Sequence, residues 1–99
     1  MVYRIEHSPE AERHLRTLTV RQQRIVLDAI ELQLAHQPTL ETRNRKPMRP
    51  NTIAPWKLRV GDLRVYYDVE DSPERVVLIR AVGVKQRNRV VCGKEEFEL

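Results

Sequence analysis

The residues best suited to chemistry lie between Trp56 and Val69, in the stretch WKLRVGDLRVYYDV. Apolar and polar residues alternate on both sides of Gly61-Asp62, which is typical of two strands joined by a tight turn. One face of this hairpin is apolar, and the other carries Lys57, Arg59, Arg64 and Tyr66. A two-residue turn places Arg64 opposite Arg59, and such cross-strand neighbours are roughly 5 Å apart. Like charges so placed destabilise a sheet unless an anion lies between them, and arginine binds phosphate in bidentate fashion. The hairpin therefore predicts a phosphate site.

The distribution of charge supports the same interpretation. The net charge is +4, but residues 43–64 hold seven cations and one acid, and residues 80–94 hold five cations and no acid. Segregated positive charge favours polyanions such as nucleic acid. The alternative is an ordinary solvated surface of lysine and arginine. Two basic segments beside the same hairpin favour the phosphate interpretation.

The elements that must position these residues can be read from periodicity and capping signals. Alternation predicts a short strand over 2–6. Ser8-Pro9-Glu10 predicts a helix start, and Thr19 with Gln22 predicts a capping box that begins a second helix. This second helix must end before Pro38, because the residue ahead of a proline is excluded from the α region. Two helices joined by a tight turn form an α-helical hairpin.

The second half of the chain predicts a loop and a sheet. Residues 37–55 have no periodicity and contain four prolines, so we expect a functional loop. Residues 75–83 are nearly continuously apolar, as in a buried central strand. Val90-Val91 predicts a last short strand, followed by a solvated acidic tail. The expected fold is a single α+β domain over 1–99, with a small twisted antiparallel sheet. The helices should cover the face of Leu63, Val65 and Tyr67 and leave the cationic face open.

Several function classes find no support in the sequence. The three histidines lack metal-ligand spacing, Cys92 is the only cysteine, and three glycines make no phosphate-binding loop, so we expect no metal and no cofactor. There is no run of 18 apolar residues and no signal-peptide pattern at the N-terminus. A chain with one cysteine and neither of these signals is expected in the cytoplasm, with no membrane contact.

WKLRVGDLRVYYDV followed by VVLIRAVGVKQR resembles the RelE/ParE superfamily of bacterial toxin–antitoxin toxins over nearly the whole chain. RelE-like members are ribosome-dependent endoribonucleases, whereas ParE-like members inhibit DNA gyrase without being nucleases. The RelE-like pattern has two alternating basic residues before the hairpin turn, which Lys57 and Arg59 match, and an arginine early on the next strand, which Arg64 matches. A further arginine after the central strand corresponds to Arg87 or Lys85. The pattern also has a tyrosine near the C-terminus, but this chain has none after Tyr67, so Tyr66 is the candidate substitute.

The resemblance implies a toxin that cleaves mRNA on the ribosome without a metal and is neutralised by a cognate antitoxin in a hetero-oligomer. Lys57 would be the base, Arg64 would hold the scissile phosphate, and Arg87 or Lys85 would assist the leaving group. Contacts to the RNA backbone are expected from Arg43, Arg45, Lys46, Arg49 and Arg89. The alternatives are a gyrase inhibitor and an inactive homologue that only binds RNA or antitoxin.

Overall fold

The two helices begin where the capping signals predict. The computed structural model describes residues 2–98. In α1 (Pro9–Arg16), the Ser8 side chain accepts a hydrogen bond from the Ala11 amide, and Pro9 occupies the first helical position. In α2 (Val20–Leu34), Thr19 and Gln22 form the reciprocal capping box. Neither helix is long and apolar enough to cross a membrane, within the part of the chain that the structure describes.

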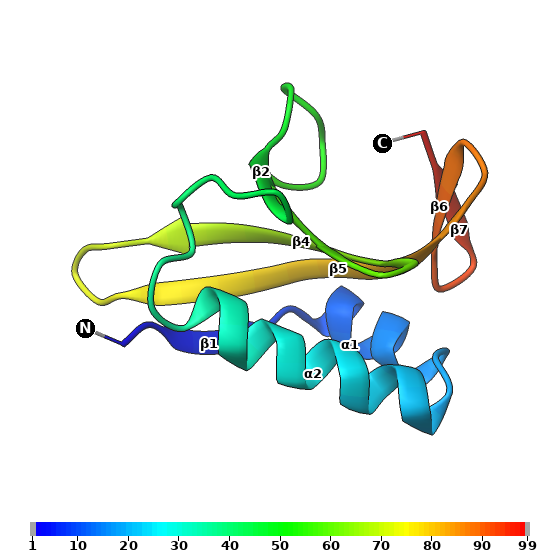
Figure 1. Ribbon diagram of the computed structural model, residues 1–99, viewed down its shortest axis with the longest axis horizontal. Helices are drawn as coiled ribbons and strands as arrows, with labels where there is room; N and C mark the ends of the chain where they lie inside the picture. The colour runs from blue at the N-terminus through cyan, green and yellow to red at the C-terminus, as the bar shows by residue number, and fades with distance from the viewer. Residues whose placement is uncertain (1, 99) are drawn as a thin grey trace.

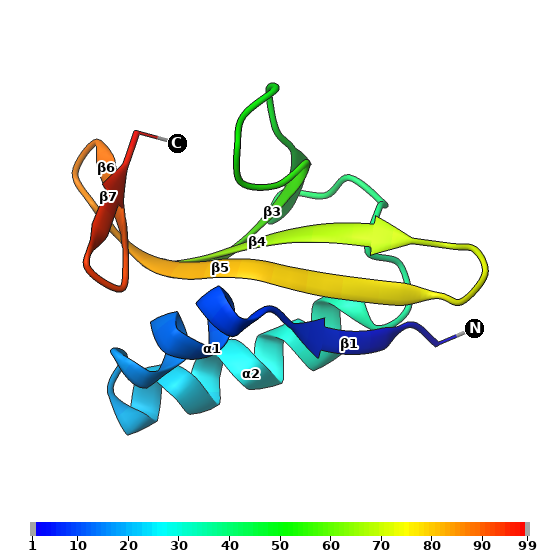
Figure 2. The same cartoon turned by 180° about the vertical axis from the view of Figure 1, so that it is seen from behind.

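Within residues 2–98, seven strands form one mixed sheet. In chain order they are β1 (Arg4–His7), β2 (Arg45–Pro47), β3 (Trp56–Val60), β4 (Leu63–Glu70), β5 (Val76–Gln86), β6 (Arg89–Cys92) and β7 (Glu95–Phe97). Strands β2 to β7 pair antiparallel in sequence order, and β1 pairs with β5 in parallel. The α+β prediction is confirmed, with both helices on one side of the sheet (Figures 1 and 2).

Three details differ from the sequence prediction. Residues 37–55 are not free of regular structure, because β2 adds an edge strand beside β3. The central strand β5 runs three residues beyond Gly83. The acidic tail is not simply solvated, since β7 pairs with β6 and Phe97 packs against buried residues. Short segments of three residues carry too little periodicity to be recognised as strands.

The main core lies between the helices and the sheet. It combines Ala11, Leu18, Val26, Ile30 and Leu34 of the helical half with Leu58, Leu63, Val65, Tyr67, Val77, Ile79 and Val82 of the sheet. The hydroxyl of Tyr67 donates a buried hydrogen bond of 2.6 Å to the Pro38 carbonyl, and Trp56 stacks on Tyr67 with 6.2 Å between ring centroids. The predicted apolar face of the hairpin is therefore the helix-covered face.

A second, smaller core covers part of the opposite face. Ala54, Tyr66, Ala81, Val90 and Cys92 are buried together, with Met48, Ile53 and Phe97 packed against them. Two walls stand on this side of the sheet in Figures 1 and 2, the segment that joins β2 to β3 and the β6–β7 hairpin. The prediction that this face stays open is wrong at its centre, because both walls deliver apolar side chains onto it.

Strand β5 has an interrupted outer edge. Its first half pairs with β1 through Ile79, and β6 joins only from Val84 onward. Helix α1 covers the interval. The Ser8 amide donates to the Ile79 carbonyl at 2.9 Å, the Ser8 hydroxyl donates to the Arg80 carbonyl at 3.1 Å, and the Val82 amide donates to Nδ1 of His14 at 3.3 Å. The backbone groups at this gap thus find partners in the helix and its cap.

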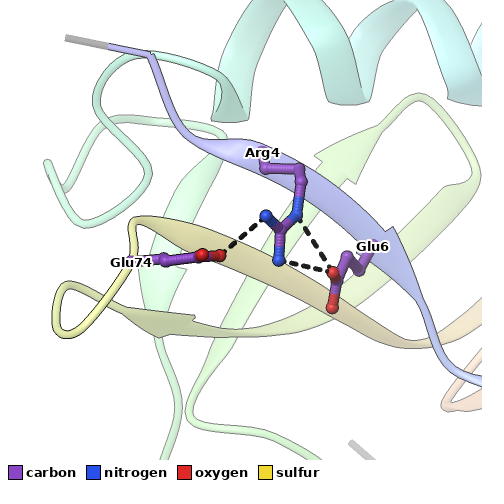
Figure 3. A network of polar contacts seen from close by, with 3 residues as sticks. All are labelled: Arg4, Glu6 and Glu74. Atoms are coloured by element: carbon purple, nitrogen blue, oxygen red, sulfur yellow. Dashed lines mark hydrogen bonds and ion pairs between the residues drawn. The ribbon is translucent and has the colours of Figure 1, made fainter.

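A small polar network joins strand β1 to the turn between β4 and β5. Arg4 on β1 pairs with Glu6 on the same strand at 2.8 Å and with Glu74, in the β4–β5 turn, at 2.7 Å (Figure 3). All three side chains are largely exposed, so the network adds orientation more than stability.

Candidate functional site

The hairpin has the predicted register. Trp56 pairs with Tyr67, Arg59 pairs directly with Arg64, and the turn at Gly61-Asp62 contains a glycine with φ of +59°. On the next strand outward, Lys46 pairs with Lys57. The face therefore carries two directly opposed pairs of like charge. Like charges at directly opposed positions of a sheet are destabilising, and an anion between them would offset this effect.

The cations of the hairpin are available to a ligand. Arg59 is exposed, while Lys57 and Arg64 are half-buried. The Arg64 guanidinium donates to the carbonyls of Gly61 and Leu63 at 2.7 and 2.9 Å, which turns it toward the hairpin turn. Within residues 2–98, none of these three cations is paired with an acid. No acid in the described part of the chain therefore neutralises their charge.

The two candidates after the central strand sit at the same end of the sheet. The Lys85 amide donates to the Asp62 carbonyl at 2.7 Å, so Lys85 lies next to the Gly61-Asp62 turn. Arg87 lies in the β5–β6 turn and has φ of 58°, a left-handed conformation that is uncommon for residues other than glycine. Both side chains are exposed. The structure thus brings Lys85 close to the hairpin turn and presents Arg87 at a tight turn beyond it.

Tyr66 does not lie on an open surface. Its register opposite Lys57 puts it on the predicted face, but it is 1% exposed and packs in the second core. Burial raises the pKa of the phenol well above its ordinary value, so the hydroxyl stays protonated at neutral pH. The other two tyrosines do not lie on this face, since Tyr67 is buried in the main core and Tyr3 packs against that core and hydrogen-bonds Asp71. Tyr66 therefore does not present the exposed phenol on the cationic face that the sequence had suggested.

Arg45 is not free to contact RNA. It is 8% exposed, and its guanidinium donates to the carbonyls of Leu40 and Gln33. The charge ties the segment after α2 to the end of that helix, where carbonyl groups lack helical partners. The prediction that Arg45 grips an RNA backbone is wrong for this reason.

The other basic candidates lie at the surface. Arg43, Lys46 and Arg49 are exposed. Arg89 is also exposed, but its guanidinium pairs with Glu96 on β7 at 2.8 Å. An exposed pair of this kind is worth at most about 1 kcal/mol, so it competes only weakly with a phosphate. Three of the four loop cations thus remain candidates for backbone contacts.

Sequence reasoning missed the residues at the gap in the β5 edge. A cavity of about 530 Å³ lies there, between α1, β5 and the β6–β7 hairpin. A second cavity of about 500 Å³ lies under residues 48–55, and Thr52, Ile53 and Arg80 line both. The one available signal was Arg80 itself, a charge inside an otherwise apolar run. A β-bulge explains it, because Tyr66 pairs with Ala81 but Tyr67 pairs with Ile79.

His14 is one of the titratable side chains that line the larger cavity. Burial lowers the pKa of its imidazole, and the neighbouring Arg13 lowers it further. Because Nδ1 accepts the Val82 amide, the proton of the neutral ring resides on Nε2. Cys92 also lines this cavity, and burial raises the pKa of its thiol to about 11, so it is a poor nucleophile at neutral pH. Among residues 2–98, no group of three His, Cys, Asp or Glu side chains is placed to hold a metal ion.

The arrangement supports binding and polarisation of a phosphodiester. Lys57 and Arg59 lie two residues apart on β3, and Arg59 pairs with Arg64 on β4, so the three cations share one face of the hairpin. Lysine and arginine side chains bind phosphate oxygens through charge-assisted hydrogen bonds. Such contacts also stabilise negative charge that develops on a phosphate during substitution. The surrounding exposed cations extend the positive surface for a longer polyanion.

The fold is that of RelE chains from solved toxin–antitoxin complexes. The chain superposes on a chain of the RelBE2 complex from Mycobacterium tuberculosis with a TM-score of 0.70 and 23% identity, covering 86% of this chain and 100% of that one. It also superposes on a chain of the archaeal RelE–RelB complex from Pyrococcus horikoshii OT3 with a TM-score of 0.64 and 21% identity, covering 88% and 99%. No protein-family model and no curated protein matches the sequence.

Proposed function

We propose that the protein is the toxin of a type II toxin–antitoxin system and that it cleaves mRNA on the ribosome. The observation that carries the proposal is the directly opposed Arg59–Arg64 pair beside Lys57, on the face of a RelE-like sheet that points away from the helices. No acid within the described residues neutralises these charges. An anionic ligand bound between these cations would offset the repulsion.

The proposed reaction is an attack by the 2′-hydroxyl of the RNA on its own neighbouring phosphorus. The bond from phosphorus to the 5′ oxygen breaks, and the products are a 2′,3′-cyclic phosphate and a 5′-hydroxyl. Lys57 takes the proton of the 2′-hydroxyl, and Arg64 binds the non-bridging oxygens as charge develops on them. Lys85 or Arg87 delivers a proton or stabilises charge at the leaving oxygen. The reaction requires no metal and no cofactor.

The proposal includes a protein partner. Both similar structures are toxin–antitoxin complexes. We propose that a cognate antitoxin lays an acidic or amphipathic segment over the cationic face, by helix docking or strand addition. Because the proposed partners, namely the antitoxin, the ribosome and mRNA, are cytoplasmic, we propose the same location for this protein.

Overexpression of variants in a bacterial host tests the proposal. Lys57→Ala and Arg64→Ala should each relieve growth arrest, because each removes a cation from the reacting phosphate. Arg24→Ala is a matched control that removes one exposed cation from α2, on the other side of the sheet. Soluble expression and unchanged thermal unfolding of the variants exclude misfolding. Full toxicity of the Lys57→Ala/Arg64→Ala double variant contradicts the proposal.

A second candidate is a ParE-like inhibitor of DNA gyrase that has no nuclease activity. The observation in its favour is that Tyr66 and Tyr67 are buried and that Phe97, near the C-terminus, carries no hydroxyl. A nuclease built on this chain has no exposed phenol on the cationic face to act as acid or base. Intact mRNA in arrested cells, together with induction of the DNA-damage response, identifies this alternative.

A further inference from the structure

The gap in the β5 edge opens into a groove that the proposed reaction does not use. The 530 Å³ cavity lies between the gap, α1 and the β6–β7 hairpin, and its volume is within the range of small-ligand sites. It shares Thr52, Ile53 and Arg80 with the 500 Å³ cavity under residues 48–55. The two cavities therefore adjoin each other at Arg80, and together they are called the groove below.

The bulge in β5 is what puts Arg80 in this groove. Tyr66 and Tyr67 pair with Ala81 and Ile79, so Arg80 is the extra residue and is left out of the ladder. Its carbonyl is held by the Ser8 hydroxyl, and the preceding carbonyl is held by the Ser8 amide. The backbone that carries the guanidinium is thus fixed, while the side chain is exposed.

The guanidinium of Arg80 has only a weak intramolecular partner. Its nearest acid is Asp68, at 3.6 Å, and both side chains are about two-fifths exposed or more. That distance is beyond a normal charge-assisted hydrogen bond, which is shorter than about 3 Å. Asp68 therefore holds the side chain in the groove without satisfying it. A phosphate oxygen would bind it better.

The groove also offers surfaces for a base and for further charge. Ile53 and Phe97 are partly buried apolar side chains on opposite walls. Unpaired RNA bases commonly lie against aromatic and apolar side chains. The remaining charged residues of the larger cavity are Arg13, Lys94, Glu10 and Glu95, with His14 beside them. The cations of the larger cavity outnumber its acids only when Arg80 is counted, so Arg80 gives the cavity its net positive charge and favours an anionic ligand.

We infer that Arg80 is a phosphate-binding residue and that this groove holds an unpaired nucleotide of single-stranded RNA adjacent to the cleaved one. The ligand class rests on the proposed function. The placement of Arg80 rests only on the bulge, the two adjoining cavities and the loose contact with Asp68. Asp68 occupies the guanidinium until a phosphate displaces it.

Two substitutions with opposite expected effects test this inference. The probe is a fluorescein-labelled single-stranded RNA octamer, 2′-O-methylated so that it cannot be cleaved, measured by fluorescence anisotropy at low salt. Arg80→Ala should weaken binding about tenfold, the usual effect of losing one charge-assisted contact. Asp68→Asn should tighten binding about two- to fivefold, since it frees the guanidinium from an exposed pair. Arg24→Ala is again the matched loss of one surface cation, and thermal unfolding checks that each variant folds.

The outcomes separate this inference from the proposed function. Opposite shifts for Arg80→Ala and Asp68→Asn, with little change for Arg24→Ala, support the groove even if the protein proves not to cleave mRNA. Equal weakening by Arg80→Ala and Arg24→Ala overturns the groove and leaves the proposed cleavage site standing. Displacement of the octamer by equimolar AMP overturns the assignment to RNA in favour of a free nucleotide. An octamer that does not bind the wild-type protein at all overturns the inference.

Discussion

Replacement of Gly83 by alanine tests whether the β6–β7 hairpin is held against the sheet as the structure describes. A Cβ at Gly83 would lie 2.6 Å from Sγ of Cys92, 2.7 Å from the Val91 carbonyl oxygen and 2.8 Å from a methyl of Val90. Each distance is shorter than any ordinary carbon contact, and one involves backbone of the paired strand. Strand β6 must therefore move away from β5.

The expected cost follows from overpacking, which typically destabilises a core by about 1–3 kcal/mol. Three contacts below 3 Å place this substitution near the upper end of that range. Alanine recovers about 0.5–1 kcal/mol of backbone entropy relative to glycine, so we expect a net loss near 2 kcal/mol. For a domain of this size, that lowers the melting temperature by roughly 10 °C. Calorimetry or urea denaturation of the wild type and variant provides the measurement.

Gly61→Ala is the matched control. Gly61 has φ of +59° and no neighbour within 4 Å of the added Cβ, so the variant is expected to pay only backbone strain of about 1 kcal/mol. The same entropy gain of about 0.5–1 kcal/mol offsets most of that strain. A second control is the Gly83→Ala/Cys92→Ala double variant, which removes one of the three clashes. Its loss of unfolding free energy should be smaller than the sum of the losses in the two single variants by at least about 0.5 kcal/mol. Equal stabilities of Gly83→Ala and Gly61→Ala, or strict additivity in the double variant, would refute the described packing.

Two further predictions concern stability. Arg45→Met should destabilise the fold by about 2–3 kcal/mol, because the buried arginine no longer donates to the carbonyls of Leu40 and Gln33. Lys46→Met should change the unfolding free energy by less than about 0.5 kcal/mol. Urea denaturation compares the two variants, and similar values would contradict the structural role of Arg45. Burial lowers the pKa of His14 in the folded state, so the unfolded chain takes up a proton first as the pH falls below about 6.5. The free energy of unfolding should therefore decrease on acidification, and the contribution of neutral His14 to stability should be complete above about pH 6.5. His14→Asn keeps an acceptor near the Val82 amide but does not titrate, so its melting temperature should depend less steeply on pH between 7.5 and 5; an unchanged slope would show that His14 is not the group responsible.

The parts of the fold that follow from local signals were predictable from the sequence. Ser8-Pro9 and the Thr19 capping box fix the helix starts, because side-chain oxygens satisfy amides that the helix leaves free. The alternation around Gly61-Asp62 fixes the hairpin register, since a slip of one residue would expose its apolar face. The cationic pairs on the other face follow from that register.

The features that depend on distant contacts were not predictable. The bulge at Arg80 breaks the period of two in β5, and nothing in the local sequence marks the position other than the charge. Tyr66 was expected on an open face, but the β6–β7 hairpin and residues 48–55 cover it. Arg45 was predicted to be one surface cation among several, but its guanidinium donates to the carbonyls of Leu40 and Gln33, which local sequence does not reveal. In each case, a contact between segments that are separate in the sequence overrides the local pattern.

Cleavage of mRNA on purified ribosomes tests the central claim most directly. Ribosomes programmed with an mRNA and stalled with an empty A site are mixed with the protein, and the RNA ends are mapped by primer extension and analysed for terminal phosphates. The proposed function predicts a cut in the A-site codon that leaves a 2′,3′-cyclic phosphate and a 5′-hydroxyl. It also predicts that Lys57→Ala and Arg64→Ala lower the cleavage rate by at least about a hundredfold, the lower end of the usual acid–base contribution, while Arg24→Ala does not. Intact mRNA with the wild-type protein, or undiminished cleavage by both variants, would contradict it.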